Sequence, residues 1–122
     1  MKIDYFTFTE LIHTDTGFPN IPTDMQHVRN LCELQTLLNK IRLLYDAPIH
    51  VNSAYRTTAV NVAVNGVPQS LHTKGCAADI RPLYEVAHEF DENFQHLINV
   101  VKSFEKELKE FIIYPTFIHI AI

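Results

Sequence analysis

The stretch Ser70-Leu-His72-Thr-Lys-Gly75-Cys-Ala77-Ala-Asp79-Ile80 places a histidine and an aspartate seven residues apart, with a glycine between them. This separation is too long for two ligands on adjacent turns of one helix face. It predicts His72 on a loop, a turn at Gly75, and Asp79 on a short central strand over residues 77–81. An imidazole and a carboxylate together favour a borderline cation such as zinc.

A catalytic zinc ion needs a third protein ligand, and the end of the chain offers His119. Residues 110–122 predict a hairpin that turns at Tyr114-Pro115-Thr116. In its last strand the isoleucines at 118, 120 and 122 share one face, and His119 lies on the other. On spacing alone, the two histidines and Asp79 fit either a metal site or three unconnected polar residues.

These residues also carry a family resemblance. The pattern Ser-x-His-x-x-Gly-x-Ala-x-Asp at residues 70–79 is preceded by Ser53-Ala-Tyr55-Arg56 and followed by a late strand histidine. In this the chain resembles the zinc D-alanyl-D-alanine peptidases, closest to their short, single-domain, phage-endolysin-like branch. The likeness covers nearly the whole chain. It implies a hedgehog/DD-peptidase-like α+β fold, with a small, mainly antiparallel sheet packed against helices.

The resemblance further implies one Zn²⁺ ion held by His72, Asp79 and His119. The implied activity is hydrolysis of peptide bonds in peptidoglycan stem peptides or D-amino-acid dipeptides, as a carboxypeptidase or an endopeptidase. Arg56 matches the arginine that stabilises the oxyanion in that family, and its alternative role is a surface ion pair.

Three further residues are expected to bind substrate: Ser53, Tyr55 and Ser70. For Ser70 two other roles stay open, orienting His72 or closing the turn.

The general base is the part that the motifs do not supply. In much of the resembling family a carboxylate lies three residues before the last histidine, where this chain has Thr116. Threonine cannot accept a proton near neutral pH, so another carboxylate must serve if the chain is catalytic. Glu110 is the first candidate by chain proximity, and the acidic stretch Glu85–Glu92 is the second.

Two other functions remain open. The absent carboxylate favours a catalytically weak or inactive relative that binds zinc or the cell wall. A structural protein of a phage particle would need no metal at all.

Composition limits the remaining possibilities. A chain of 122 residues suits a single domain over 1–122. Its net charge of -4 argues against a nucleic-acid partner, which usually requires a basic surface. No apolar run approaches the ~20 residues that cross a bilayer. The first residues show no signal-peptide pattern, so we expect a protein that is cytoplasmic as encoded, or a phage-derived enzyme that reaches the cell wall after release. We also expect a monomer.

Local signals predict the helices. Thr7 and Glu10 have capping-box spacing, with Phe6 and Leu11 placed as a hydrophobic staple. Thr23 and Gln26 repeat that spacing and predict a long helix to about Tyr45, with an apolar stripe widened by Leu37 and Leu44 and with Cys32 buried. A short helix capped by Thr57 and an amphipathic helix over about 93–108 follow. A strand over 48–53 lies between the long helix and the Thr57-capped one.

Overall fold

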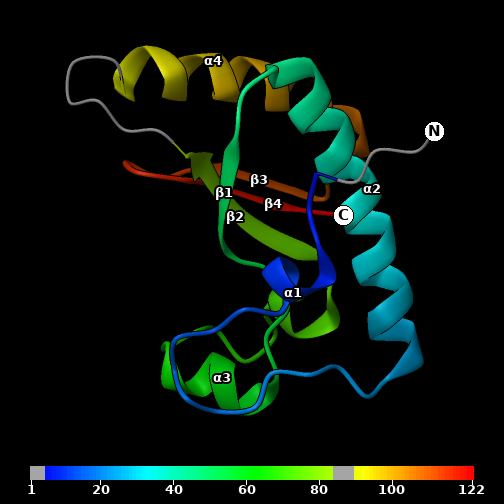
Figure 1. Cartoon of the computed structure of the whole chain (residues 1–122). Helices are drawn as coiled ribbons and strands as arrows, with labels where there is room; N and C mark the ends of the chain where they lie inside the picture. Colours follow the sequence, from blue (N-terminus) through cyan, green and yellow to red (C-terminus); the bar gives the residue numbers. More distant parts are fainter. Residues whose placement is uncertain (1–4, 84–89) are drawn as a thin grey trace.

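The computed structural model describes residues 5–83 and 90–122, and its centre is an antiparallel sheet with strand order β1-β2-β4-β3 (Figure 1). The predicted α+β fold with a small antiparallel sheet is confirmed. The strand bounds are β1 Ile49–Ser53, β2 Ala77–Pro82, β3 Glu110–Ile113 and β4 Ile118–Ala121.

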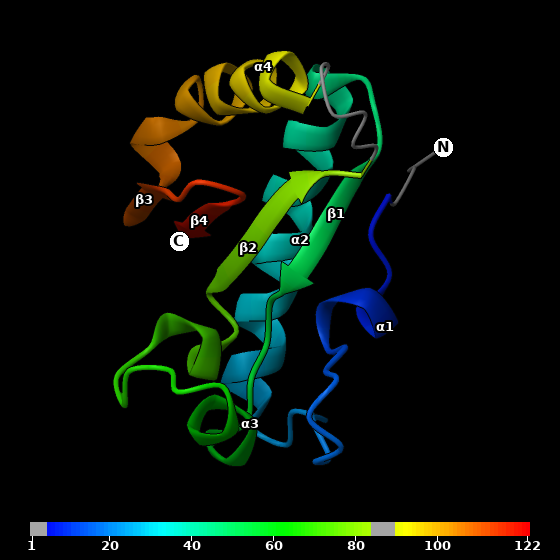
Figure 2. The ribbon, with the colours of Figure 1, turned by 90° about the vertical axis from the view of Figure 1, so that its left-hand side faces the viewer.

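The long helix α2, Met25–Tyr45, lies behind β1 and β2 (Figure 2). Its fully buried leucines and Ile41 pack with the isoleucines of β2 and β4 in one hydrophobic core. This packing uses one face of the sheet and leaves the other face for polar side chains. Leu44 was expected in the stripe but is 55% exposed, and Cys32 is also exposed, because both lie on the solvent side of the helix.

The start of α2 differs by one residue from the expectation. The cap is Asp24, whose carboxylate accepts hydrogen bonds from the backbone N–H groups of Gln26 and His27. An ionised carboxylate at this position satisfies two unpaired N–H groups and interacts favourably with the helix dipole. Thr23 therefore lies outside the helix.

The shorter helices follow their local signals. α1, Phe8–Leu11, has the predicted capping box between Thr7 and Glu10, and both staple residues are buried. α3, Thr58–Ala63, is capped by Thr57, and the chain turns just after it at Asn65, which has φ 58°. A 3-10 turn, η1, covers Leu71–Lys74.

The last helix begins and ends earlier than predicted. α4 spans Phe90–Lys102 and a separate 3-10 turn, η2, spans Glu105–Glu107. Phe94, Leu97 and Val101 bury the apolar face of α4 against the core. α4 and α3 lie at opposite ends of the molecule in both views (Figures 1 and 2). No helix among the described residues is long and apolar enough to cross a membrane.

Candidate metal centre

The sheet register places a row of side chains across its open face. Asp79 on β2 is directly opposite His119 on β4, and Ser53 on β1 is opposite Asp79 on the other side. The register shifts between Val51 and Ser53, so Asn52 forms a bulge there. Because side chains alternate along a strand, the extra residue turns Ser53 away from the core face that Val51 occupies.

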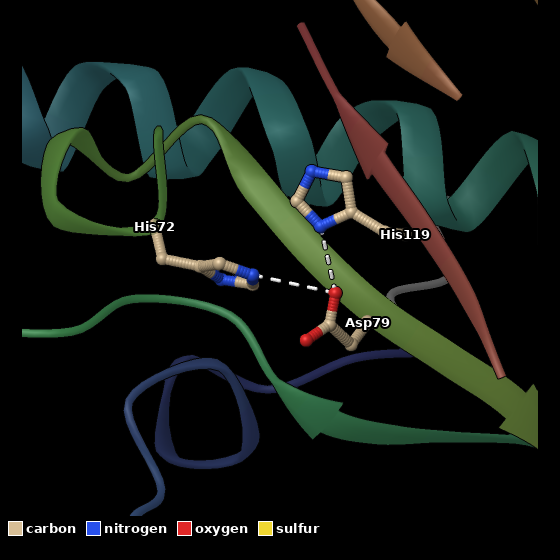
Figure 3. Close-up of side chains that lie close together, drawn as sticks. All are labelled: His72, Asp79 and His119. Atoms are coloured by element: carbon tan, nitrogen blue, oxygen red, sulfur yellow. Dashed lines mark hydrogen bonds and ion pairs between the residues drawn. The ribbon is translucent and has the colours of Figure 1, made fainter. Parts of the chain in front are cut away.

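Three of the predicted residues converge on one point. His72, Asp79 and His119 each offer a ligand atom, and these atoms lie within 4.8 Å of one another. Figure 3 shows the three side chains pointing towards each other, His72 from the loop before β2 and His119 from β4. Asp79 Oδ1 lies 3.3 Å from His72 Nε2 and 2.8 Å from His119 Nδ1. Two imidazoles and one carboxylate at such spacing fit the ligand set of a catalytic zinc ion.

His72 is held by groups that fix its ring. Its Nδ1 lies 2.6 Å from the carbonyl oxygen of Ala54, and it must donate there because a carbonyl only accepts. Nε2 therefore faces Asp79, and in the neutral ring it is the nitrogen whose lone pair can bind a metal ion. Ser70 Oγ accepts the backbone N–H of His72 and caps η1. This contact closes the turn, and the roles of Ser70 in orienting His72 and in binding substrate stay predictions.

Gly75 lets the chain pass from η1 into β2. Its φ is 76°, a region that L side chains rarely adopt. A Cβ at this position would also lie 2.6 Å from the backbone oxygen of His27 on α2. Glycine is required here for both reasons, and the turn brings Asp79 back beside His72.

His119 is bonded on both ring nitrogens. Nδ1 faces Asp79, and Nε2 lies 2.9 Å from Glu110 Oε1 on the neighbouring strand β3. The hydrogen bond with Asp79, followed by that with Glu110, raises the pKa of His119 although partial burial opposes the shift. Burial would raise the pKa of Asp79, but hydrogen bonds from His119 and His72 bring it down to about 2. Asp79 therefore stays ionised and able to bind a cation.

Arg56 lies beside this cluster. Its Nη2 is 3.6 Å from Asp79 Oδ2, its Nε donates to Ser53 Oγ at 3.0 Å, and its Nη1 donates to Asn61 Oδ1 at 3.3 Å. Burial lowers the pKa of Arg56 and the charge of Asp79 opposes this, yet a guanidinium stays charged at any physiological pH. The site therefore contains a fixed cation whose orientation is set by three partners.

Two asparagines that no sequence motif indicated hold Arg56 in place. One contacts its guanidinium, and the other bonds to the backbone on either side of it. Asn61 is 3% exposed and also donates to the carbonyl oxygen of Val67. Asn20 is buried, donates to the carbonyl oxygens of Ile12 and Tyr55, and accepts the backbone N–H of Thr57. Their positions in loop-like and short helical sequence gave no signal for this role.

Two cavities share Arg56 and Asp79, and the other predicted residues line one or the other or neither. The first, of about 440 Å³, includes Ser53 in its lining, and the second, of about 350 Å³, includes Ser70 and Glu110. Tyr55 lines neither of these cavities: it is 5% exposed and lies near the ring of His27. Its assignment to substrate binding stays a prediction.

No other described residues form a comparable cluster of metal ligands. Cys76 lies in the motif but outside the ligand group, with its Sγ 3.9 Å from the carbonyl oxygen of Lys74. Thr116 is exposed in the hairpin turn. Glu85 and Glu89, two candidates for the base, lie outside the described residues. Glu92, near the start of α4, is exposed and lines neither cavity.

Comparison with known proteins agrees with the motifs. A search of curated proteins found no match to this chain. A family model described as peptidase M15 matches residues 4–121, nearly the whole sequence. The chain therefore belongs to the M15 peptidases, the zinc D-alanyl-D-alanine carboxypeptidase-like family that its motifs resemble.

Proposed function

We propose that this protein is a zinc-dependent peptidase that hydrolyses amide bonds in the peptide stems of bacterial cell-wall peptidoglycan. The observation that carries the proposal is the convergence of His72, Asp79 and His119 within 4.8 Å beside the fixed cation Arg56. Family membership supports peptidase activity and a substrate of the peptidoglycan type.

His72 Nε2, Asp79 Oδ1 and His119 Nδ1 are the atoms that would hold the ion. Zinc with three such ligands supplies a Lewis acid and lowers the pKa of a bound water towards ~7. Asp79 brings negative charge at neutral pH, because its pKa is about 2. The hydrogen bond from His72 Nδ1 to Ala54 fixes the ring so that Nε2 would face the ion.

The role proposed for Arg56 is to stabilise negative charge on the substrate. During amide hydrolysis the carbonyl oxygen becomes an oxyanion, and a nearby fixed cation interacts more strongly with that state than with the neutral carbonyl. Bonds to Ser53 and Asn61 hold the guanidinium before substrate arrives, so little reorganisation is needed during the reaction.

Glu110 is the proposed proton acceptor. It lines the same cavity as His72 and His119, and its side chain is 41% exposed, so water reaches it. One of its oxygens accepts the hydrogen bond from His119 Nε2, which leaves the other oxygen to accept a proton. Ser53 and Ser70 remain proposed substrate contacts from the two sides of the cluster.

The test is metal analysis of the purified protein together with a peptidoglycan-digestion assay. We expect one zinc ion per chain and release of stem peptides or amino acids. Arg56→Ala should keep the zinc and the melting temperature but lower kcat/KM by roughly 10²-fold, the usual effect of losing an oxyanion partner.

If the protein binds zinc but digests no peptidoglycan under any condition, it is better described as a non-catalytic relative. Thr116, which stands where much of the family has a carboxylate, favours that alternative. If the protein neither binds zinc nor digests peptidoglycan, a structural role is the remaining alternative. An Arg56→Ala variant as active as the wild type would remove Arg56 from the reaction.

A further inference from the structure

The two cavities share part of the metal centre: all three metal ligands line the second, and Asp79 also lines the first. The first lies between the loop at residues 13–16, the end of β1 and α3, whereas the second lies between the loop at 65–72 and the β3–β4 hairpin. Arg56, Asp79 and Phe117 line both cavities. Binding space therefore extends from Arg56 and Asp79 into both cavities.

The volumes of the two cavities also indicate room for a peptide that extends through both. At about 440 and 350 Å³, each cavity alone falls within the range of small-ligand sites. A peptide whose reacting carbonyl sits between Arg56 and the metal ligands would therefore have room for residues before and after the reacting bond.

The charges of the lining disfavour a terminal carboxylate. Among the residues that the structure describes, Arg56 is the one lysine or arginine that lines either cavity, and it lines both, already paired with Asp79. The first cavity carries a further carboxylate, Asp15, bonded to His13 at 3.0 Å, and the second carries Glu110. An enzyme that removes a C-terminal residue gains by pairing the terminal carboxylate with a cation, whereas here the additional acidic groups would repel it.

From these observations we infer that the protein is an endopeptidase, which cleaves an internal amide bond of an extended stem peptide bound across both cavities. This inference rests on the proposed zinc-peptidase function. In the reaction the C–N bond breaks, the water oxygen bonds to the carbonyl carbon, and the proton taken from water passes to the leaving nitrogen. The products are one peptide with a new carboxylate and one with a new amine.

The first test compares two peptides on the zinc-loaded protein. Both are N-acetylated stem pentapeptides that end in D-alanyl-D-alanine, one with a free C-terminal carboxylate and one with a carboxamide. We expect both to be cut at the same internal bond, identified by mass spectrometry, with kcat/KM values within about threefold of each other. Release of terminal D-alanine from the free acid alone would overturn the inference and leave the peptidase function standing.

The second test uses three exposed valines in one short stretch. Val64 lines the first cavity, Val67 lines the second, and Val62 lines neither, with exposed fractions of 44%, 67% and 68%. Val64→Trp and Val67→Trp should each fill one cavity and lower kcat/KM for the capped peptide by at least tenfold. Val62→Trp should match the wild type.

Zinc content and melting temperature of each variant would verify that the fold and the metal site are intact. Anisotropy of a fluorescent capped peptide should report the same loss as weaker binding. Full activity in either cavity variant would contradict binding across the site. If the zinc-loaded wild type does not cleave or bind either peptide, the proposed function is wrong, and the inference is wrong with it.

Discussion

Glu110 contacts His119 through one carboxylate oxygen, and this contact allows two roles of the residue to be separated. In Glu110→Gln the amide oxygen can still accept from His119 Nε2, but the group can no longer take a proton from water. In Glu110→Ala both functions are lost. We expect Gln to retain zinc affinity and lose hydrolysis, and Ala to lose hydrolysis and weaken zinc binding by about 10–100-fold.

Zinc affinity would be measured by competition with a chromophoric chelator and hydrolysis with the capped stem peptide. Glu107→Gln is the matched control, because this exposed carboxylate pairs only weakly with Lys40, at 3.8 Å, and lines neither cavity. If Glu110→Gln remains active, Glu110 only orients His119. The base must then come from Glu85, Glu89, Asp91 or Glu92.

At the level of elements, the turn between η1 and β2 determines whether the two halves of the metal motif meet. Gly75→Ala should lower the free energy of unfolding by about 1–2 kcal/mol from the positive φ and by a further ~1–3 kcal/mol from the contact with the His27 backbone. Because α2 must shift or the turn must open, zinc affinity should fall as well. Urea unfolding and chelator competition measure the two effects.

Gly17 provides the matched control for this prediction. Its φ is 83°, but a Cβ there would meet nothing within 4 Å. Gly17→Ala should therefore show only the conformational loss and bind zinc normally. Equal destabilisation of the two variants would mean that the close approach of Gly75 to α2 contributes nothing.

At the level of the whole molecule, zinc should stabilise the fold, because its ligands come from η1, β2 and β4 and converge only when the chain is folded. A ligand at 100 times its dissociation constant adds about 2.7 kcal/mol to the free energy of unfolding. The melting temperature should accordingly rise with zinc and fall again with a chelator. His119→Ala should abolish this response and His13→Ala, an exposed residue outside the ligand group, should keep it. A response that survives in His119→Ala would place the ion elsewhere.

The sequence by itself determined the caps of α1 and α3, most of the apolar face of α2 and that of α4, the hairpin, the turn between His72 and Asp79, and the strand face of His119. These features depend on residues only a few positions apart, such as Thr7 with Glu10, or on the alternation that turns His119 away from its neighbouring isoleucines. A capping hydrogen bond or a strand face needs no information from the rest of the chain.

Only the tertiary structure decided how the site is completed. The contact of Glu110 with His119 depends on the register of β3 against β4, and the place of Ser53 depends on the bulge at Asn52. The bond between Arg56 and Asn61 depends on how separate loops pack around the sheet, and so do the shapes of the two cavities. Register and loop packing are set by the sum of many contacts between distant segments, and no short stretch of sequence contains that sum.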